Sequence, residues 1–329
     1  MTSTITLRDP ADLLAHVDHA LGFRPADSAV LVAVESGRIG LTARVDLAGA
    51  IEGATGFLRH LNTDKVQSVT LIAYSDDPAA ATQTLLNLRA VVGVGGDSLA
   101  VTTAGWFDLT KGVSEVRPLS DITASPIYTA HVYRGSVVAP NRAALLPTAL
   151  PADVQEQTAE HAAHYLALPA ELGSPIDQVC AWTQAEPAAI NPQTAGRLAA
   201  TLADRAVRDA VLVTALGGTT EQVDHILFQT PGAAQAADEV FTGDQAPNAT
   251  TQHLRDVLAV VVSHTLDTPS LSAEPLALMA FVSWWSGDCA RAQVAADAAL
   301  SRQPDQRLAH LANKAATHGL PPTWARAGR

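Results

Sequence analysis

The chain has 329 residues, of which 47% are hydrophobic, 16% charged and 5% aromatic, and this composition excludes disordered, collagen-like and small disulfide-stapled proteins. Its 21 basic and 33 acidic residues give a net charge of −12, and no segment concentrates Lys or Arg. We therefore expect no nucleic-acid partner, because phosphate binding requires a clustered cationic surface.

Two features of the sequence bear on its compartment. Cys180 and Cys289 lie far apart, and neither has a second cysteine or a histidine at metal-ligand spacing. The N-terminal segment has no basic region followed by an apolar core, and the most apolar later run, Val257–Val262, is too short to span a bilayer. We expect a cytoplasmic protein with reduced, buried thiols and no membrane association.

The first elements that the sequence predicts are a helix and two strands. Asp9 and Pro10 suit the N-cap and first positions of a helix that ends near Leu21. A continuous β-branched run follows at Ser28–Val34, which is typical of a strand covered on both faces. The next strand, Ile39–Leu47, alternates apolar and polar residues, so one of its faces is polar.

Helices and strands continue to alternate up to about residue 120. The expected elements are a helix at 53–61, a strand at 68–74, a helix at 79–92 and a strand at 98–104. Asp77 and Pro78 supply the N-cap and first position of the second of these helices. We expect 112–117 to pair with 106–109 as a hairpin. The alternation predicts a parallel or mixed sheet with flanking helices.

From about residue 126 the pattern is helical throughout. The predicted helices are at 126–135, 141–147, 152–168, 175–186, 192–203, 205–216, 220–229, 249–265, 272–286, 289–302 and 305–318. Prolines lie between many of these segments and support the division. The sequence therefore predicts an α/β domain over 1–125 and an all-α domain over 126–329.

The clearest local pattern lies in a predicted helical hairpin at 272–304. Gly287, Ala292, Ala299, Leu300 and Pro304 have the spacing of the second helix of a tetratricopeptide repeat. One convincing repeat favours a hairpin that packs on its own domain, since a solenoid requires about three or more. The alternative is a protein-binding groove, for which the candidate residues are the aromatic side chains Phe281, Trp284 and Trp285.

Four charged residues form a second candidate site. Arg44 and Asp46 project from one strand face, and Arg24 and Asp27 lie on the loop that enters the neighbouring strand. The two arginines could hold a ligand carboxylate or phosphate in bidentate contact. The favoured alternative is an internal network in which Arg24 pairs with Asp46, or Arg44 with Asp27, and fixes the first helix to the sheet.

Tyr74 and Asp76 lie at the carboxyl end of a strand, where open α/β sheets usually bind ligands. Asp76 and Asp77 together could hold Mg²⁺. The favoured alternative is that Asp77 caps the next helix and Asp76 is solvated.

Other motifs carry less weight. Gly93–Gly96 follows a helix and precedes a strand, which is the reverse of the order that a nucleotide-binding loop requires, so we predict a turn. His16 with His19, and His161 with His164, each share a helix face, but no third metal ligand is identifiable. We therefore predict no metal, no cofactor and no catalytic residue, and the usual hydrolase, phosphate-loop and zincin motifs do not occur in the sequence.

Several segments together carry a family resemblance. They are Leu21–Val30, Ala43–Leu47, Gly105–Asp108, Asp204–Ala210, Leu276–Pro304 and Gly319–Trp324. Their combination resembles the family called domain of unknown function 4192, which occurs in actinobacteria and their phages. Many relatives carry paired cysteines after the tryptophan strand, whereas Trp106–Leu109 leads here to Lys111 without a cysteine. A metal or redox role based on that pair therefore does not transfer.

The leading functional hypothesis is a non-enzymatic interaction or adaptor module with a protein partner or with self-association. The alternative is a small-molecule or nucleotide binder, or an enzyme, that uses the carboxyl edge of the sheet. Its pocket would contain Arg24, Asp27, Arg44, Asp46, Tyr74 and Asp76.

Overall fold

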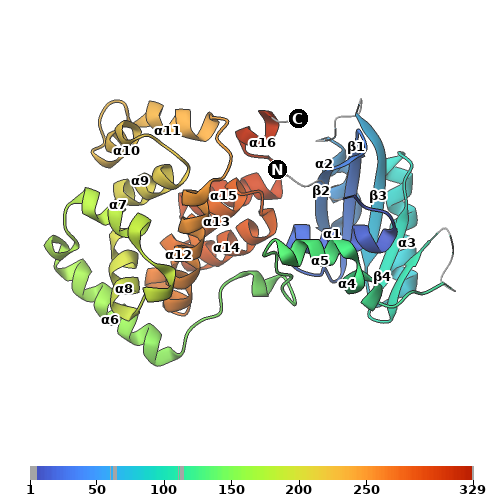
Figure 1. Ribbon diagram of the computed structural model, residues 1–329, viewed down its shortest axis with the longest axis horizontal. Coiled ribbons are helices and arrows are strands. Elements are labelled where there is room, and N and C mark those ends of the chain that lie inside the picture. The colour runs from blue at the N-terminus through green and yellow to red at the C-terminus, as the bar shows by residue number, and fades with distance from the viewer. Residues whose placement is uncertain (1–5, 60, 62–64, 110, 112–114, 328–329) are drawn as a thin grey trace. The chain divides into compact units, whose positions relative to one another are not determined.

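The computed structural model describes residues 6–59, 61, 65–109, 111 and 115–327 (Figure 1). Contacts divide the chain into two compact units, Met1–Arg142 and Ala143–Arg329. The first unit contains the sheet and the second is helical, which confirms the predicted architecture. In the described residues, no helix is both long enough and apolar enough to cross a membrane.

The first unit is built on a five-stranded sheet within the described residues. Its strands are β1 (Ser28–Glu35), β2 (Arg38–Asp46), β3 (Val66–Tyr74), β4 (Ser98–Thr102) and β5 (Gly105–Asp108). Their order is β2-β1-β3-β4-β5. The β3–β4 pair is parallel and the other neighbouring pairs are antiparallel, so the sheet is mixed, as predicted.

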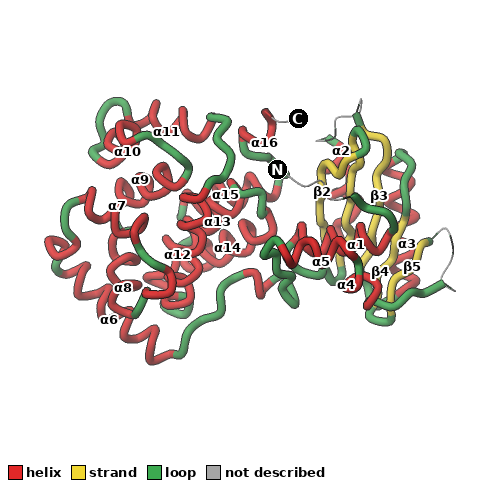
Figure 2. The backbone as a smooth tube through the Cα atoms, in the orientation of Figure 1, coloured by secondary structure: helices red, strands yellow, loops and turns green. Residues whose placement is uncertain are grey.

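Helices cover both faces of the sheet (Figure 2). The helices α2 (Ala50–Leu58) and α3 (Pro78–Val92) cover one face, where Leu31 and Leu71 are buried. The helices α1 (Pro10–Leu21), α4 (Ser120–Ala124) and α5 (Pro126–Tyr133) cover the other face, where Val30 and Ile72 are buried. Because successive strand residues point to opposite faces, the continuous apolar runs of β1 and β3 supply both cores.

The helix boundaries in this unit follow local capping chemistry. The carboxylates of Asp9 and Asp77 accept backbone N–H groups in the first turns of α1 and α3, and a proline stands at the start of each helix. Gly22 ends α1 with φ of 75°, a left-handed conformation that favours glycine. Both predicted starts are confirmed.

The predicted hairpin after β4 has a different arrangement. β5 pairs with β4 from Gly105 to Asp108, so the hairpin joins β4 to β5, whereas the expected one joined 106–109 to 112–117. Trp106 does pair with Arg117 in a single bridge. Residues 112–114 of the predicted hairpin lie outside the described residues.

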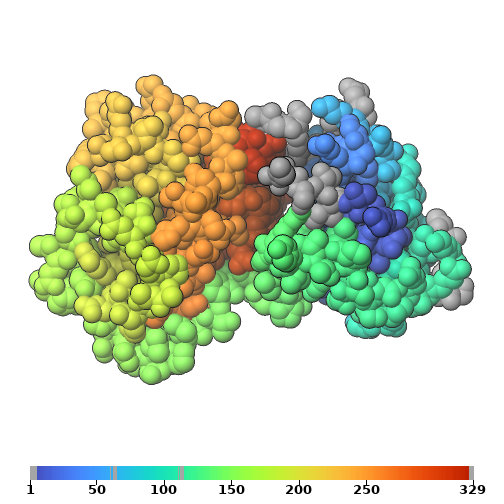
Figure 3. Space-filling model, in the orientation of Figure 1, coloured from blue at the N-terminus to red at the C-terminus, as the bar shows by residue number. Residues whose placement is uncertain are grey.

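The second unit is made of helices around a continuous apolar core. They are α6 (Ala152–Ala167), α7 (Pro175–Gln184), α8 (Pro192–Thr201), α9 (Arg205–Ala215), α10 (Thr220–Leu227), α11 (Ala233–Thr242), α12 (Ala249–Thr265), α13 (Pro269–Trp285), α14 (Cys289–Arg302), α15 (Arg307–Thr317) and α16 (Thr323–Ala327). Trp182 and Trp285 are fully buried in this core. The space-filling view shows one outer face of this unit, coloured from green to red along the chain (Figure 3).

The helices α13 and α14 form the expected hairpin. Gly287 makes the turn with φ of 82°. Ala292 and Ala299 of α14 are completely buried, as expected of small residues where two helices approach closely.

Candidate functional site

The charged residues of the predicted amino-terminal site pair with near neighbours. Arg24 Nε donates to Asp18 Oδ2 at 2.9 Å, and Arg44 Nη2 lies 2.7 Å from Asp46 Oδ1. The predicted partners were therefore wrong, because Arg24 does not pair with Asp46 nor Arg44 with Asp27. Arg44 and Asp46 lie two positions apart on one face of β2, which is why they meet each other.

The Asp76 and Asp77 carboxylates, which follow the end of β3, accept hydrogen bonds from backbone N–H groups. Asp76 Oδ1 accepts a hydrogen bond from the Thr103 N–H at 3.2 Å, and Asp77 caps α3. The Asp27 side chain is exposed, and the backbone carbonyl oxygen of Asp27 accepts a hydrogen bond from the Leu47 N–H at 3.0 Å. These contacts account for both Asp76 and Asp77 without a ligand.

A buried polar cluster lies beneath α1. Asp18 is 1% exposed, and burial raises its pKa to about 6 although Arg24 acts in the opposite direction. The Tyr74 hydroxyl and Asp18 Oδ1 are buried and have no hydrogen-bond partner. Burial, and then the charge of Asp18, raise the pKa of Tyr74 well above its ordinary value, so the phenol stays protonated. The structure thus brings Arg24 and Tyr74 together through Asp18, a residue that the sequence analysis missed.

Three histidines gather between α1 and α5. His16 Nδ1 lies 3.2 Å from His131 Nε2, and the ring of His19 stacks on that of His131 with a centroid distance of 4.8 Å. Burial and then the neighbouring imidazoles lower the pKa of both His16 and His19 to about 4, and burial lowers the pKa of His131. All three rings are therefore neutral at pH 7. In the described part of the chain, no group of three or more His, Cys, Asp or Glu side chains is arranged to hold a metal ion.

The aromatic residues assigned to a protein partner lie in or beside the core of the second unit. Phe281 is 7% exposed and Trp285 is fully buried. Trp284 is partly exposed, and its Nε1 donates to the Leu320 carbonyl oxygen at 2.8 Å. Trp324 of α16 donates to the Trp285 carbonyl oxygen at 3.0 Å. The C-terminal segment therefore packs on these residues, and a protein partner or self-association stays a prediction.

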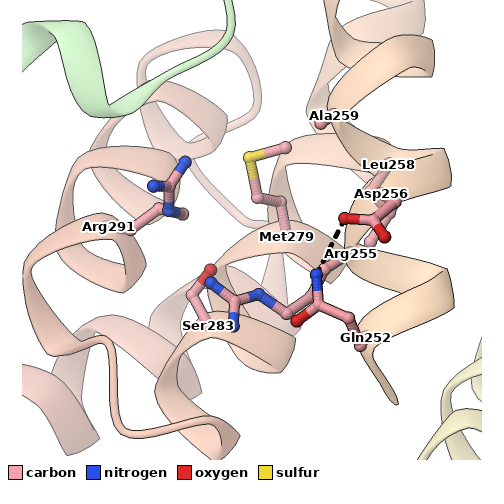
Figure 4. Close-up of a pocket in the computed structure, with 8 residues that line it drawn as sticks. All are labelled: Gln252, Arg255, Asp256, Leu258, Ala259, Met279, Ser283 and Arg291. Carbon is pink, nitrogen blue, oxygen red and sulfur yellow. Dashed lines mark hydrogen bonds between the residues drawn. The ribbon is translucent and has the colours of Figure 1, made fainter. Parts of the chain in front are cut away.

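A cavity of about 220 Å³ lies among α12, α13 and α14 (Figure 4). Its lining residues are Gln252, Arg255, Asp256, Leu258, Ala259, Met279, Ser283 and Arg291. In the close-up, the guanidinium groups of Arg255 and Arg291 lie on one side, and the hydrogen-bonded Gln252 and Asp256 lie on the other. The methionine side chain stands between the two polar sides. The cavity thus combines charged, hydrogen-bonding and apolar surface.

The two arginines of this cavity converge on one carboxylate. Arg291 Nε lies 3.0 Å from Asp288 Oδ2, whereas Arg255 Nη2 is 3.5 Å from the same oxygen. Arg291 also donates to the Leu145 carbonyl oxygen at 2.7 Å. Burial lowers the pKa of Arg255, and Asp288 opposes that effect while Arg291 adds to it. Arg255 is therefore held against the cavity by one long contact.

Sequence reasoning named His16 and His19 but missed their partner His131, and it missed the two arginines of the cavity, because the members of each group come from distant segments. His131 is 115 residues from His16, and Arg291 is 36 positions after Arg255. One local signal was present, since Asp288 follows the turn glycine of the hairpin and stands where an N-cap is expected. That this N-cap carboxylate also pairs with two arginines can be predicted only when the packing of the helices is known.

Comparisons with known proteins give a family and nothing finer. No curated protein and no solved structure matches the chain significantly. The family model described as "Domain of unknown function (DUF4192)" matches residues 10–323, which include almost all of both units. The chain therefore belongs to the DUF4192 family.

Proposed function

We propose that the chain is a small-molecule-binding protein whose helical unit takes a polar ligand with a carboxylate or phosphate group. The observation that carries this proposal is Arg255, whose side chain is 28% exposed at the cavity and whose guanidinium makes one long contact to protein, at 3.5 Å to Asp288. A guanidinium presents five N–H donors, so one contact leaves donors of Arg255 to face solvent or a ligand in the cavity. An anionic ligand group would supply acceptors for these donors.

The geometry favours an oxyanion as the bound group. The planar guanidinium fork matches the paired oxygens of carboxylate and phosphate, and bidentate contacts of this kind are short and strong. Arg291 stands beside Arg255 on the same side of the cavity (Figure 4). Asp288 Oδ2 lies within ion-pair distance of both arginines.

The remaining lining limits the size and character of the ligand. A volume of about 220 Å³ is below the usual range for drug-sized ligands, so the ligand is small. Met279 and Leu258 offer apolar contact, and the Asp256 carboxylate accepts hydrogen bonds. A compact metabolite with one acidic group, a short apolar part and a hydrogen-bond donor fits this description.

The experiment is a thermal-shift screen of small carboxylates and phosphates against the full chain. A ligand present at about 100 times its dissociation constant stabilises the fold by about 2.7 kcal/mol, which is readily detected. Titration calorimetry of each hit then compares Arg255→Gln and Arg291→Gln with the wild type. We expect both substitutions to abolish or strongly weaken binding.

The matched control is Arg307→Gln, which removes an exposed arginine of α15 away from the cavity lining. It should bind as the wild type does. Circular dichroism of all three variants confirms that the helical unit is folded. A screen without hits, or hits that bind equally well to the Arg255 and Arg291 variants, contradicts the proposal.

A further inference from the structure

The histidine cluster in the first unit brings two imidazole nitrogens within hydrogen-bond distance, and this distance is also that of two ligands of one metal ion. His16 Nδ1 and His131 Nε2 are 3.2 Å apart and come from two different helices, α1 and α5. Two imidazole nitrogens bound to one tetrahedral metal at about 2.0 to 2.1 Å are separated by about 3.3 Å. The pair therefore has the spacing of two ligands of one ion.

The surroundings fix the two rings in this arrangement. The ring of His131 stacks on that of His19 at a centroid distance of 4.8 Å and lies tilted against that of His16 at 5.3 Å. His19 is itself held by Ser136 Oγ, 2.9 Å from its Nδ1, and by edge contact with Tyr128. A pair of ligands that packing already orients loses little freedom when an ion binds.

A third nitrogen at the cluster has no partner in the protein. His19 Nε2 is buried without a hydrogen bond, and His19 is 7% exposed. A buried polar atom of this kind is expected to have a partner, such as an ordered water or an ion-bound solvent molecule. The neutral imidazole is the form that binds metal.

We propose that His16 and His131 together bind one divalent transition-metal ion of the zinc, copper or nickel class, with solvent at the remaining coordination positions. Imidazole nitrogen is a preferred ligand of these ions, whereas magnesium and calcium prefer oxygen. With two protein ligands the site is open, unlike a structural zinc site that is closed by four. It differs from the sequence-based prediction of no metal because its ligands meet only in the folded unit.

The test is calorimetric titration of the chelator-treated full chain with zinc chloride and, separately, with copper(II) chloride. We expect one ion per chain. His16→Gln and His131→Gln should each weaken binding by more than about tenfold, the smallest loss usually caused by removing even a residue that supports a metal ligand. Magnesium chloride should give no binding.

The matched control is the double variant H161Q/H164Q. These two histidines lie three residues apart on α6, as His16 and His19 do on α1, but His164 pairs with Glu171 and is half exposed. Metal binding should be unchanged in this variant. If it is lost there, the surface pair is the site and the proposal is overturned.

A second measurement covers the case in which His16→Gln or His131→Gln does not fold. Electron paramagnetic resonance of the copper-loaded wild type should show hyperfine splitting from imidazole nitrogens. No binding of zinc or copper, binding that survives both substitutions, or a copper spectrum without nitrogen splitting would each refute the site.

Discussion

One arginine holds the connection between α3 and β4. The Arg89 guanidinium donates, at 2.7 to 3.2 Å, to the carbonyl oxygens of Val69, Val94, Gly96 and Asp97 and to Ser98 Oγ. We predict that Arg89→Gln lowers the free energy of unfolding of the first unit by about 2 kcal/mol, because partly buried acceptors lose their donor. Urea denaturation followed by circular dichroism measures the loss.

The control for this substitution is Arg59→Gln. Arg59 is exposed just after α2, and its replacement should change the free energy of unfolding by less than about 0.5 kcal/mol. Equal losses in the two variants would show that the hydrogen bonds of Arg89 do not contribute to stability.

Cys289 is the first residue of α14, a position that ordinarily lowers a thiol pKa. Here burial and then Asp288 raise the pKa of Cys289 to about 11. We predict that in a Cys180→Ser background iodoacetamide alkylates the native thiol at pH 8 on the order of 100-fold more slowly than the urea-unfolded thiol, because the native thiolate fraction is small. Mass spectrometry against time measures both rates, and similar rates would contradict the pKa shift.

The amino-acid types of the polar residues were predictable, but their partners were not. Arg24 reaches Asp18 on the preceding helix, and the order of α1, its glycine end and β1 brings the two together. The cluster of His16 with His131 depends on α5 crossing α1, which no local pattern encodes. Side-chain pairs across elements follow from packing, so sequence reasoning identified candidate charges without their contacts.

At the scale of elements, α6 and α8 pack closely through a glycine. A Cβ on Gly196 of α8 would lie 2.6 Å from the Thr158 carbonyl oxygen and 2.9 Å from the Ala162 backbone nitrogen. We predict that Gly196→Ala lowers the free energy of unfolding of the second unit by about 2 kcal/mol, because the helices must separate. Thermal and urea unfolding both measure this change.

Gly56 of α2 provides the matched comparison. A Cβ there meets no atom within 4 Å. Gly56→Ala should therefore be neutral or should stabilise the helix by up to about 1 kcal/mol, since alanine has the higher helix propensity. If both alanine variants behave alike, close helix approach at Gly196 is not limiting.

Element boundaries were predictable where local chemistry sets them. Asp9 with Pro10 and Asp77 with Pro78 begin helices at the expected positions, because capping involves residues within one turn. The sequence analysis assigned no helix to α11, which lies between Gly232 and Gly243, residues typical of turns. The pairing of β5 with β4 was missed because its two-residue turn, Thr103–Ala104, has none of the residues typical of a tight hairpin turn.

At the scale of the whole molecule, each unit has its own core. The core clusters around Leu31 and Val30 belong to the first unit, and the cluster around Trp182 and Trp285 belongs to the second. Because the two cores are separate, each unit can unfold locally without the other. We predict that Arg89→Gln speeds amide hydrogen exchange in the first unit without affecting the second, and that Gly196→Ala does the reverse.

Hydrogen exchange followed by mass spectrometry of peptic fragments makes this comparison. The double variant should show the sum of the two patterns, because substitutions without shared partners act independently. Faster exchange in both units after either single substitution would show that the two cores open as one.

The position of β2 at the end of the strand order has a consequence for encounters between copies of the chain. An outermost strand offers unpaired backbone N–H and C=O groups to any foreign strand, and charged side chains there oppose such additions. β2 carries Arg38, Arg44 and Asp46, and the last two hold each other as an ion pair. The charges that suggested a ligand site in the sequence thus protect the sheet from edge-to-edge aggregation.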